Sequence, residues 1–571
     1  MANDTEKLTG VEKIKEESRA LRGTIGEELQ ESTASFHKDT LQLLKFHGTY
    51  QQDDRDLRTE RKKAGLDKAY SCMVRCRIAG GRMTASQLAA QLDLCDSLGN
   101  STLKITTRQT LQLHGILKED LREAINRINK INLSTLAACG DVNRNVMCCP
   151  CKRVGTVHEE IQQLSHDIMV ALAPRTKGYH ELWITDLETG ETTLEGGTVT
   201  PAEEEPLYGT RYLPRKFKVG IALPEDNCID LYANDLGFLA VVREGKIIGY
   251  NVTVGGGMGV TPSAAKTFPA LAKRMAFVRP EQAIDVAKAV LMVQRDFGNR
   301  EDRKIARMKY LIANWGIEKF RAKVEEYYGE ALEDCTEDEV HGFDDHMGWQ
   351  EQGDGLWSYG LNVENGRLYD NENTQLKAAF RAIIAEFDPA IRLTAHQSII
   401  FCDINEAQRD RLLQILKDHG VPLTEETSTV RRWSMACVGL PTCGLSVTES
   451  ERALPGIMDK IEAPLAKLGL DQEKFTIRMT GCPNGCARPY NSDIALVGQT
   501  KDRYRVFVGG ALLGTRLNFA YKEKVLTADV PTELVKIFTA FKANRQENET
   551  LGGFCDRVGR DELERLADAD Y

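Results

Sequence analysis

Apolar and polar positions follow a pattern that occurs twice along the chain. Ile105–Gln112 resembles Leu393–Ile400, and both runs read as β-strands. Each predicted strand lies between two stretches with helical periodicity. The four predicted helices are Ala85–Leu98 and Leu121–Ile128 in the first copy, and Thr374–Glu386 and Glu406–Asp418 in the second.

Short glycine-containing motifs repeat in the same order. Gly80–Arg82 has a counterpart in Asn365–Arg367, and Val254–Gly256 resembles Val508–Gly510, each of the latter two a strand that ends in a glycine turn. The intervals are far too long for a solenoid. We therefore predict that a whole α+β half is duplicated, giving a pseudo-twofold molecule with a site between the halves.

The first 68 residues differ from the rest. They are rich in charge and prone to form helices, with Val11–Arg22 as one candidate, and they lack the apolar density of a core. We expect an extension or arm, which is either a solvated helix pair or a surface for docking a partner.

Composition narrows the class of protein. A formal charge of −10 argues against general nucleic-acid binding. The chain contains no run of about 18 apolar residues that would span a membrane. The first residues are polar and have no signal-peptide core. Fifteen cysteines, an odd number spread over a long chain, indicate reduced thiols and metal ligands rather than disulfides. We expect a cytoplasmic protein.

Four cysteines near the end of the chain have the spacing of a metal centre. Cys437 and Cys443 are followed by Cys482 and Cys486, which lie in a run of small residues and proline. Four thiolates can hold a [4Fe–4S] cluster or a tetrahedral ion. Structural zinc favours closer spacing than that of Cys437 and Cys443. We therefore favour an iron–sulfur cluster over zinc or four unrelated buried thiols.

Basic residues gather in the first copy but not in the second. Arg75 and Arg77 are expected on one face of a strand from Met73 to Ile78, and Arg300, Arg303 and Arg307 on one helix face. Any one of these sets can be a solvated basic surface. Together, in an acidic chain, they suggest a pocket for a strongly anionic group. The other candidates are Arg108, His114, Arg144, Lys216, Lys218 and Lys309.

A further group of thiols follows the turn at Arg144. Cys148, Cys149 and Cys151 are close enough for a second metal site, but they have no evident fourth ligand. We interpret them as packing or incidental thiols.

Several longer motifs carry a family resemblance. The chain resembles the sulfite/nitrite reductase family, and within it the hemoprotein (beta) subunits of assimilatory sulfite reductases. The resemblance runs over nearly the whole chain. Its most specific parts are Tyr50–Asp56, Arg75–Arg77, Thr107–Thr110, Asn143–Val146, Leu213–Lys218, Ser434–Cys437 and Thr480–Cys486.

The resemblance implies a fold with two ferredoxin-like half-domains and two larger α/β domains that bind the cofactors. The corresponding boundaries are an extension at 1–68, half-domains at 69–140 and 346–430, and cofactor domains at 141–345 and 431–571. The implied cofactors are siroheme, which carries eight carboxylates, and one [4Fe–4S] cluster.

By matching position, the resemblance assigns roles to the candidate residues. Cys437, Cys443, Cys482 and Cys486 would ligate the cluster, with Cys486 also axial to the siroheme iron. The substrate cations would be Arg75, Arg144, Lys216 and Lys218. Candidates for the siroheme carboxylates are Arg108, Gln112, His114, Arg303, Arg307 and Lys309.

The expected activity is reduction of sulfite to sulfide by six electrons. One rival is reduction of nitrite to ammonia, although that branch tends to have asparagine where this chain has Lys218. Another is an electron carrier, or a zinc-stapled binding protein, that uses the four cysteines alone. No dinucleotide or flavin motif is evident, so we expect electrons from a partner, either an NADPH-oxidising flavoprotein or a ferredoxin.

Overall fold

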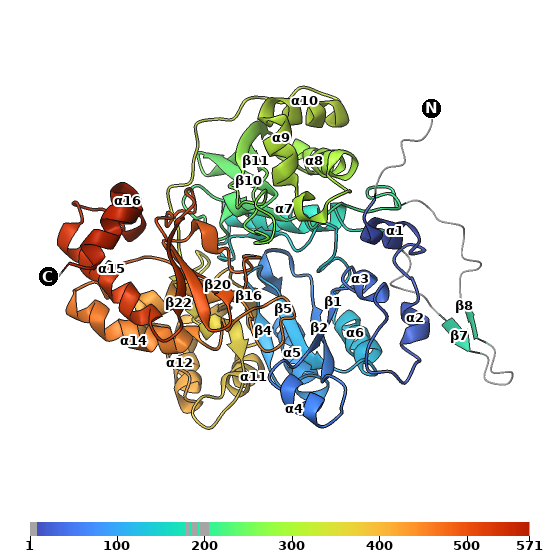
Figure 1. The fold of residues 1–571 in the computed structure, drawn as a ribbon, viewed down its shortest axis with the longest axis horizontal. Coiled ribbons are helices and arrows are strands. Elements are labelled where there is room, and N and C mark those ends of the chain that lie inside the picture. The colour runs from blue at the N-terminus through green and yellow to red at the C-terminus, as the bar shows by residue number, and fades with distance from the viewer. Residues whose placement is uncertain (1–7, 177–182, 186–191, 195–204, 570–571) are drawn as a thin grey trace.

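Two pairs of matching sheets form the framework of the protein (Figure 1). The computed structural model describes residues 8–176, 183–185, 192–194 and 205–569. Within them the chain forms four five-stranded sheets and the small sheet β7–β8 (Trp183–Thr185 and Thr192–Leu194). None of the helices in this described part is long and apolar enough to cross a membrane.

The two smaller sheets interlock the halves of the chain. Their strand orders are β1-β2-β5-β4-β15 and β13-β14-β17-β16-β3. The short strand β3 (Arg82–Met83) of the first half pairs with β16, and β15 (Arg367–Leu368) of the second half pairs with β4. Each half therefore completes the sheet of the other. The remaining strands are β1 Thr49–Asp53, β2 Tyr70–Arg75, β4 Leu103–Ile105, β5 Leu111–Ile116, β13 Gly348–Glu351, β14 Leu356–Leu361, β16 Ala390–Leu393 and β17 Ile399–Asn405.

The four predicted helices are present and cover these two sheets. They are α5 (Ala85–Ser97), α6 (Leu121–Lys130), α11 (Leu376–Phe387) and α12 (Arg409–Asp418). Their apolar faces share one continuous hydrophobic core with both sheets, in which Leu88 and Phe380 are fully buried. The two half-domains thus pack as one unit.

The two larger sheets share a second topology. Their orders are β12-β11-β10-β9-β6 and β18-β19-β20-β21-β22. In each sheet the first three strands along the chain are parallel to one another, and each of the last two is antiparallel to the strand that precedes it. The first sheet consists of β6 Met147–Cys148, β9 Val219–Ala222, β10 Leu236–Arg243, β11 Lys246–Val254 and β12 Lys273–Val278, with α7 Val157–Ala171, α8 Ala283–Phe297, α9 Met308–Trp315 and α10 Ile317–Tyr328. The second consists of β18 Ser434–Ala436, β19 Ile477–Thr480, β20 Ile494–Thr500, β21 Arg503–Val508 and β22 Phe519–Leu526, with α13 Thr429–Arg432, α14 Leu454–Lys467, α15 Val530–Asn544 and α16 Leu551–Ala567. The predicted duplication is therefore confirmed.

The repeated runs at Ile105 and Leu393 are hairpin loops, which corrects their interpretation as strands. Each run leaves one strand and enters the next through a tight loop. Gln109 and Gln397 adopt positive φ angles of 55° and 65° in these loops. The Gln109 amide donates a hydrogen bond to the Leu393 carbonyl at 3.1 Å, so the loops meet across the pseudo-twofold axis. The two runs are therefore similar in sequence because the two hairpin loops contact each other, and not because they line one face of a sheet.

The glycine motifs occupy equivalent positions, as predicted. Gly255 and Gly509 both follow a strand with φ of 92°. Gly81 and Gly366 have φ of 74° and 71°, and a Cβ atom on either would overlap a carbonyl oxygen of the opposite hairpin loop, that of Leu393 or of Ile105. Glycine is required there because the two halves approach at backbone distance.

The N-terminal segment is not an arm that lacks a core, contrary to our expectation. β1 is a strand of the first sheet, and Leu21 and Phe46 are buried in the core of the first large domain. The candidate helix at Val11 is shorter than predicted, because α1 (Gly10–Glu16) ends before residues 19–21, whose φ angles are positive. The short helices α2 (Ile25–Glu28), α3 (Thr40–Leu43) and α4 (Arg58–Lys63) follow. The four domain boundaries stay predictions.

Substitution of Gly81 by alanine tests the interlocking of the halves. Gly81→Ala should destabilise the protein through backbone strain and through the clash with the Leu393 carbonyl oxygen, together about 2–4 kcal/mol. Gly65→Ala is the matched control, because Gly65 has a φ of 69° but no atom within 4 Å of the place that a Cβ would occupy. The apparent midpoint of thermal unfolding should fall clearly further for Gly81→Ala. Equal shifts for the two variants would contradict a close approach at Gly81.

Candidate functional site

Two neighbouring parallel strands bring the four cysteines together. β18 and β19 pair with Ala436 opposite Met479, so Cys437 and the Gly481–Cys486 loop leave the sheet at the same edge. The Cys437 amide donates to the Met479 carbonyl at 3.1 Å, and the Gly481 amide donates to Cys437 Sγ at 3.3 Å. Cys443 lies on the loop between these strands, so the predicted set gathers as expected.

Burial disfavours the ionised form of these thiols in the protein alone. Burial, together with the neighbouring Cys486, raises the pKa of Cys437 to about 12 and that of Cys443 and Cys482 to about 11. Four thiolates at one place therefore need a metal to neutralise them. In a tetrahedral zinc site the sulfurs would be about 3.8 Å apart. Among the described residues, these four do not form a set of ligand atoms within 4.8 Å, which fits the wider spacing of a [4Fe–4S] cluster.

Glycines let this loop pack closely against the loop that carries Cys443 and Ser446, and against Met258 of the first half of the molecule. A Cβ on Gly481 would overlap the Ser446 hydroxyl, and Gly485 has a φ of 66°. The loop packs against the glycine-rich segment after β11, where the Val260 amide donates to the Pro483 carbonyl at 2.9 Å. The cluster cysteines of the second half thus face a segment of the first half.

The N-terminal segment holds the other cysteine loop. The Arg55 guanidinium donates to the carbonyls of Ser446 and Cys443, and the Arg55 amide donates to the Pro441 carbonyl at 3.3 Å. Asp56 forms an ion pair with Arg452 at 2.7 Å. The motif at Tyr50–Asp56 therefore positions the loop that carries Cys443.

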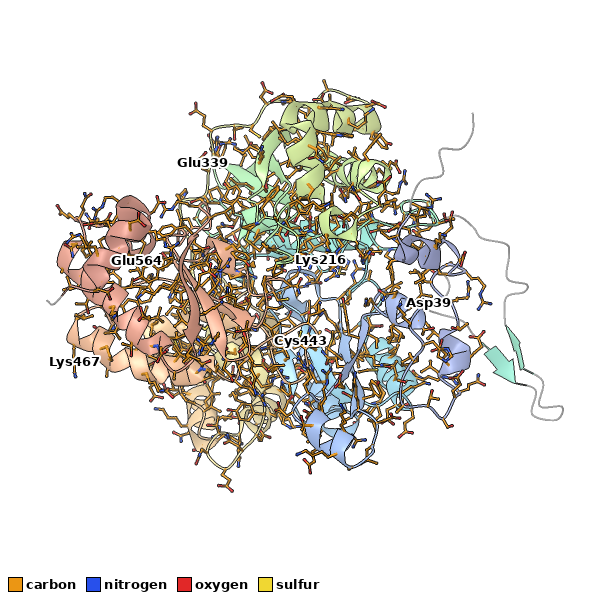
Figure 2. All side chains as sticks on the ribbon, in the orientation of Figure 1. Asp39, Lys216, Glu339, Cys443, Lys467 and Glu564 are labelled. Carbon is orange, nitrogen blue, oxygen red and sulfur yellow. The ribbon has the colours of Figure 1, made fainter. Side chains whose placement is uncertain are left out.

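Three of the predicted cations come together just before the parallel strands of the first large sheet. Arg144 and Phe217 are neighbours in a parallel extension of β6 and β9, since the Arg144 amide donates to the Phe217 carbonyl at 3.0 Å. Lys216 and Lys218 flank Phe217, which is buried in the core. Because successive side chains of an extended chain point to opposite faces, both lysines point away from the core. Figure 2 labels Lys216 and Cys443 near the middle of the molecule.

A row of polar side chains crosses the first small sheet. Arg75 lies opposite Gln112, Gln112 opposite Lys104, and Lys104 opposite Arg367 on four adjacent strands. With its amide oxygen turned towards Arg75, Gln112 accepts a hydrogen bond from Arg75 Nε at 2.8 Å. His114 is buried two residues further, and neither of its ring nitrogens has a partner among the described residues.

The electrostatic neighbours of the two lysines show that the halves converge. Burial, with Arg144, Arg215 and Arg307 beside it, holds the pKa of Lys216 well below its usual value. Cys486 acts in the opposite direction on the pKa of the same lysine, so this cysteine is close by. Burial and the neighbouring Lys216 and Arg108 likewise lower the pKa of Lys218. An anion bound here would restore both ammonium groups.

The cations divide into two groups according to their partners. Some form ion pairs: Arg303 with Asp141 at 2.7 Å, Arg307 with Asp235 at 2.6 Å, and Lys104 and Arg367 with Glu451. The others lack a carboxylate partner within the described residues: Arg75, Arg144, Lys216 and Lys218. Arg108 donates to the Asn234 side chain and to the Asn145 carbonyl.

Two predicted arrangements of basic residues are wrong. Arg300, Arg303 and Arg307 do not share a helix face, because a 3-10 turn at Arg303–Ile305 precedes α9, which begins only at Met308. Arg77 lies beyond the end of β2 and donates to the Met169 carbonyl at 2.7 Å, away from Arg75. Lys309 donates to the carbonyls of Gly257, Gly259 and Phe268, and so holds the glycine-rich segment.

Some residues at the site escaped the sequence reasoning. Tyr50 is an electrostatic neighbour of Arg75, Arg144 and Arg215, and burial raises its pKa. Lys45 lies beside Arg303, and burial lowers its pKa to about 8. Tyr50 and Arg215 stand inside recognised motifs, so their motifs were the available signal. Lys45 has no such signal.

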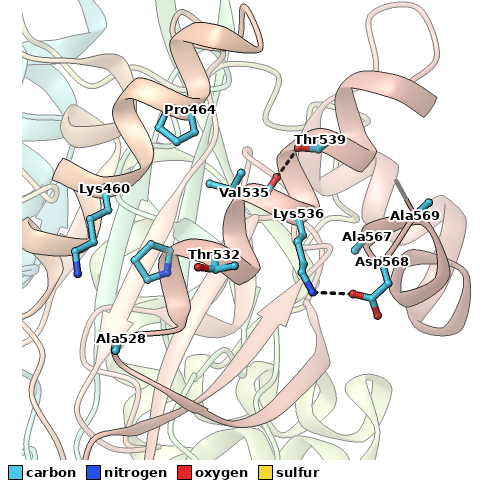
Figure 3. Close-up of a pocket in the computed structure, with 11 residues that line it drawn as sticks. Lys460, Pro464, Ala528, Thr532, Val535, Lys536, Thr539, Ala567, Asp568 and Ala569 are labelled. Atoms are coloured by element: carbon cyan, nitrogen blue, oxygen red, sulfur yellow. Dashed lines mark hydrogen bonds and ion pairs between the residues drawn. The ribbon is translucent and has the colours of Figure 1, made fainter. Parts of the chain in front are cut away.

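A hollow elsewhere on the surface is unrelated to this chemistry. It lies between α14, α15 and the end of α16, where Lys536 pairs with Asp568 at 2.8 Å (Figure 3). Its lining contains neither a cysteine nor any of the predicted cations.

Comparisons with known proteins identify the family. Residues 139–332 and 428–571 match the nitrite and sulphite reductase 4Fe-4S domain, and residues 65–131 and 350–419 match the nitrite/sulfite reductase ferredoxin-like half domain. The chain belongs to the nitrite and sulfite reductase family. The paired matches agree with the duplicated sheets.

Individual members of the family are similar over nearly their full length. The sulfite reductase [NADPH] hemoprotein beta-components of Staphylococcus haemolyticus and Bacillus subtilis are each 43% identical, over 97% and 96% of this chain and 95% of each relative. The sulfite reductase [ferredoxin] of Synechococcus elongatus is 42% identical over 99% of this chain and 92% of its own. The solved structure of the Mycobacterium tuberculosis NirA protein has a TM-score of 0.79 at 27% identity and 98% coverage of both chains.

The residues present fit the cofactors of this family, siroheme and one [4Fe–4S] cluster. The gathered thiols suit the cluster, and Cys486 is exposed at the edge that faces the first half. The unpaired cations and the unpartnered His114 suit a macrocycle with many carboxylates. These curated relatives share the name sulfite reductase, with NADPH named in two cases and ferredoxin in the third.

Replacement of Cys486 tests its predicted position between cluster and siroheme. Cys486→Ser should abolish sulfite reduction and change the absorption spectrum, because a serine oxygen is a poor ligand between two iron centres. Replacement of Cys437, Cys443 or Cys482 should instead lose roughly four irons per chain. Cys555→Ser is the control, since Cys555 is a buried thiol of α16 in the same domain. Normal turnover with an unchanged spectrum in Cys486→Ser would contradict the bridging assignment.

Proposed function

We propose that Arg75, Arg144, Lys216 and Lys218 bind sulfite and assist its six-electron reduction to sulfide opposite Cys486. The supporting observation is that these four half-buried cations lie in one region without a carboxylate partner among the described residues, next to the exposed cysteine of the four. Buried cations without anionic partners are costly, and a dianion would compensate them.

The two lysines and the two arginines are proposed to have different chemical tasks. Reduction of sulfite consumes protons, because each oxygen departs as water. Burial and neighbouring cations lower the pKa of Lys216 and Lys218 in the protein alone, and a bound dianion would favour their ammonium forms, which can donate a proton to a departing oxygen. Arg75 and Arg144 are held by Gln112 and by the Gly140 carbonyl, and they fix charge and geometry. When bound, siroheme supplies the iron that binds sulfite and the cluster supplies electrons.

Other residues are proposed to hold the macrocycle. Arg108, Gln112 and His114 lie next to the four substrate cations, and the Nε of Arg108 has no partner among the described residues. Arg303, Arg307 and Lys309 are engaged with protein groups, so any contact they make with a siroheme carboxylate is shared with those groups.

The electron donor is proposed to be a separate protein, either an NADPH-dependent flavoprotein or a ferredoxin. Relatives of both kinds by name are nearly equally similar to this chain, at 43% and 42% identity. The experiment is to purify the protein, record its absorption spectrum and measure sulfide formation with each donor in turn. A Soret band with a strong red band and sulfide formation with one donor would support the proposal. A spectrum without siroheme bands would contradict it.

The rival substrate is nitrite, and Lys218 is the residue that we expect to discriminate. Removing one cation weakens the binding of a dianion about twice as much as that of a monoanion. At an effective dielectric of about 20, a contact near 4 Å contributes roughly 4 kcal/mol per unit charge before desolvation. Lys218→Asn should therefore lower kcat/KM for sulfite at least about tenfold more than for nitrite.

The measurement uses both substrates and one artificial donor, with Lys246→Asn as the control on the exposed start of β11. The control should leave both values of kcat/KM unchanged. If Lys218→Asn lowered both by the same factor, Lys218 would be a general structural cation.

A further inference from the structure

A second group of metal-ligand side chains lies in the first half, apart from the four cluster cysteines. It consists of Cys149, Asp226, Cys228 and His346, whose ligand atoms all lie within 4.8 Å of one another. Their side chains are almost fully buried, with exposed fractions of 1%, 5%, 1% and 4%. Cys148 and Cys151 do not join them: Cys151 contacts Gln350, and Cys148 packs against Gly80. The three neighbouring thiols thus separate, and only Cys149 finds ligand partners.

The ligand atoms of this group point toward one another, but not all of them have a hydrogen-bond partner among the described residues. Asp226 Oδ1 accepts hydrogen bonds from the amides of Cys228 at 3.0 Å and Asp344 at 3.3 Å, which fixes the carboxylate. Its other oxygen lies 3.1 Å from His346 Nε2 but has no aligned hydrogen bond among the described residues. Cys149 Sγ is 3.8 Å from the same nitrogen. A tetrahedral zinc ion separates its N, O and S ligands by about 3.4 to 3.8 Å.

The pseudo-twofold symmetry places this group at the counterpart of the iron–sulfur site. Cys148 pairs with β9 and binds the Gln109 side chain at 3.2 Å, just as Ala436 pairs with β19 and binds Gln397 at 3.2 Å. The next residues, Cys149 and Cys437, are therefore equivalent.

The second cysteine of the group, Cys228, is likewise equivalent to a cluster cysteine of the other copy. Asp230 and Arg488 both have left-handed backbones, with φ of 51° and 52°, and each begins a short 3-10 helix. Two residues before them stand Cys228 and Cys486. Both thiols of the buried group thus match cluster cysteines of the other copy.

We propose that Cys149, Asp226, Cys228 and His346 bind a structural zinc ion. Two thiolates, one imidazole and one carboxylate form a four-ligand set that zinc accepts, and the protein closes all four positions. His346 Nδ1 has no hydrogen-bond partner among the described residues, and the nearby Asp344 carboxylate oxygen is 3.9 Å away.

The burial of the group argues against reactive chemistry. A nucleophilic cysteine needs access to its substrate, and neither thiol is exposed by more than 1%. The structural consequence of zinc is clear from the three segments that carry the ligands: the end of β6, the loop after β9, and the linker before β13. This linker joins the two halves, and the Asn227 amide donates to its Gly342 carbonyl at 3.0 Å. The zinc ion would fasten the linker to the first large sheet.

The test measures zinc directly in the full-length protein with its cofactors. Zinc and iron are quantified by plasma mass spectrometry, and zinc K-edge X-ray absorption reports the ligands independently of siroheme. We expect about one zinc per chain, with two sulfurs at about 2.3 Å and two nitrogen or oxygen ligands at about 2.0–2.2 Å. Cys228→Ser should lower zinc at least fivefold and keep the iron content. Cys151→Ser, the matched neighbouring thiol, should keep both metals.

Three outcomes would overturn the proposal. The first is wild-type protein with full iron but less than about a tenth of a zinc per chain after growth with added zinc. The second is zinc that is lost in Cys437→Ser and kept in Cys228→Ser, which would place it in the cluster site. The third is a disulfide between Cys149 and Cys228 in the intact protein. The zinc content and zinc-edge spectrum of the wild-type protein decide the question even if the Cys228→Ser variant fails to fold.

Discussion

The structure depends on a high density of buried positive charge between its two halves. Buried carboxylates compensate the outer cations: Asp230 pairs with Arg478 and Arg488, and Glu451 with Lys104 and Arg367. Together these two carboxylate groups join the first half to the second. Breaking one such pair would leave an uncompensated buried charge, at a cost of about 3–5 kcal/mol. These ion pairs use up the carboxylates at the junction of the halves. The remaining cations, Arg75, Arg144, Lys216 and Lys218, have no carboxylate partner among the described residues and can bind an external anion.

The duplication explains how such a site can be built. Both copies use the same backbone: hairpin loops with left-handed glutamines, and glycines where the copies meet. Because the loops touch across the pseudo-twofold axis, residues at equivalent positions face one another. Thr107 of the first hairpin loop donates to the Cys486 carbonyl at 3.0 Å, and Arg488 donates to the Thr107 carbonyl at 2.6 Å. One copy can supply cations and the other thiols to the same region.

The sequence allowed the duplication and the cysteine site to be predicted because both leave local signals. No other residue type can replace glycine where two backbones approach closely, or cysteine where a thiolate binds a metal, so both residues mark their sites in the sequence. The hairpin loops were mistaken for strands because Gln109 and Gln397 have positive φ angles, which the residue type glutamine does not predict. The arginine series at residues 300–307 has helical spacing, but a 3-10 turn interrupts it. The partners of Cys149 could not be predicted, since they come from three segments that only the fold brings together.

The two copies differ most in how they close around their thiols. Cys228 is 1% exposed and has a carboxylate and an imidazole beside it, whereas its counterpart Cys486 is exposed and faces the cations of the other half. A zinc ion with every position taken by protein ligands can only stabilise the fold, while an open position at a metal centre admits a substrate or a second cofactor. The difference in exposure at this one pair of equivalent positions would therefore separate a closed structural site in one copy from an open redox site in the other. The choice follows from neighbours contributed by distant segments, Asp226 and His346 on one side and Lys216 on the other, rather than from the cysteines themselves.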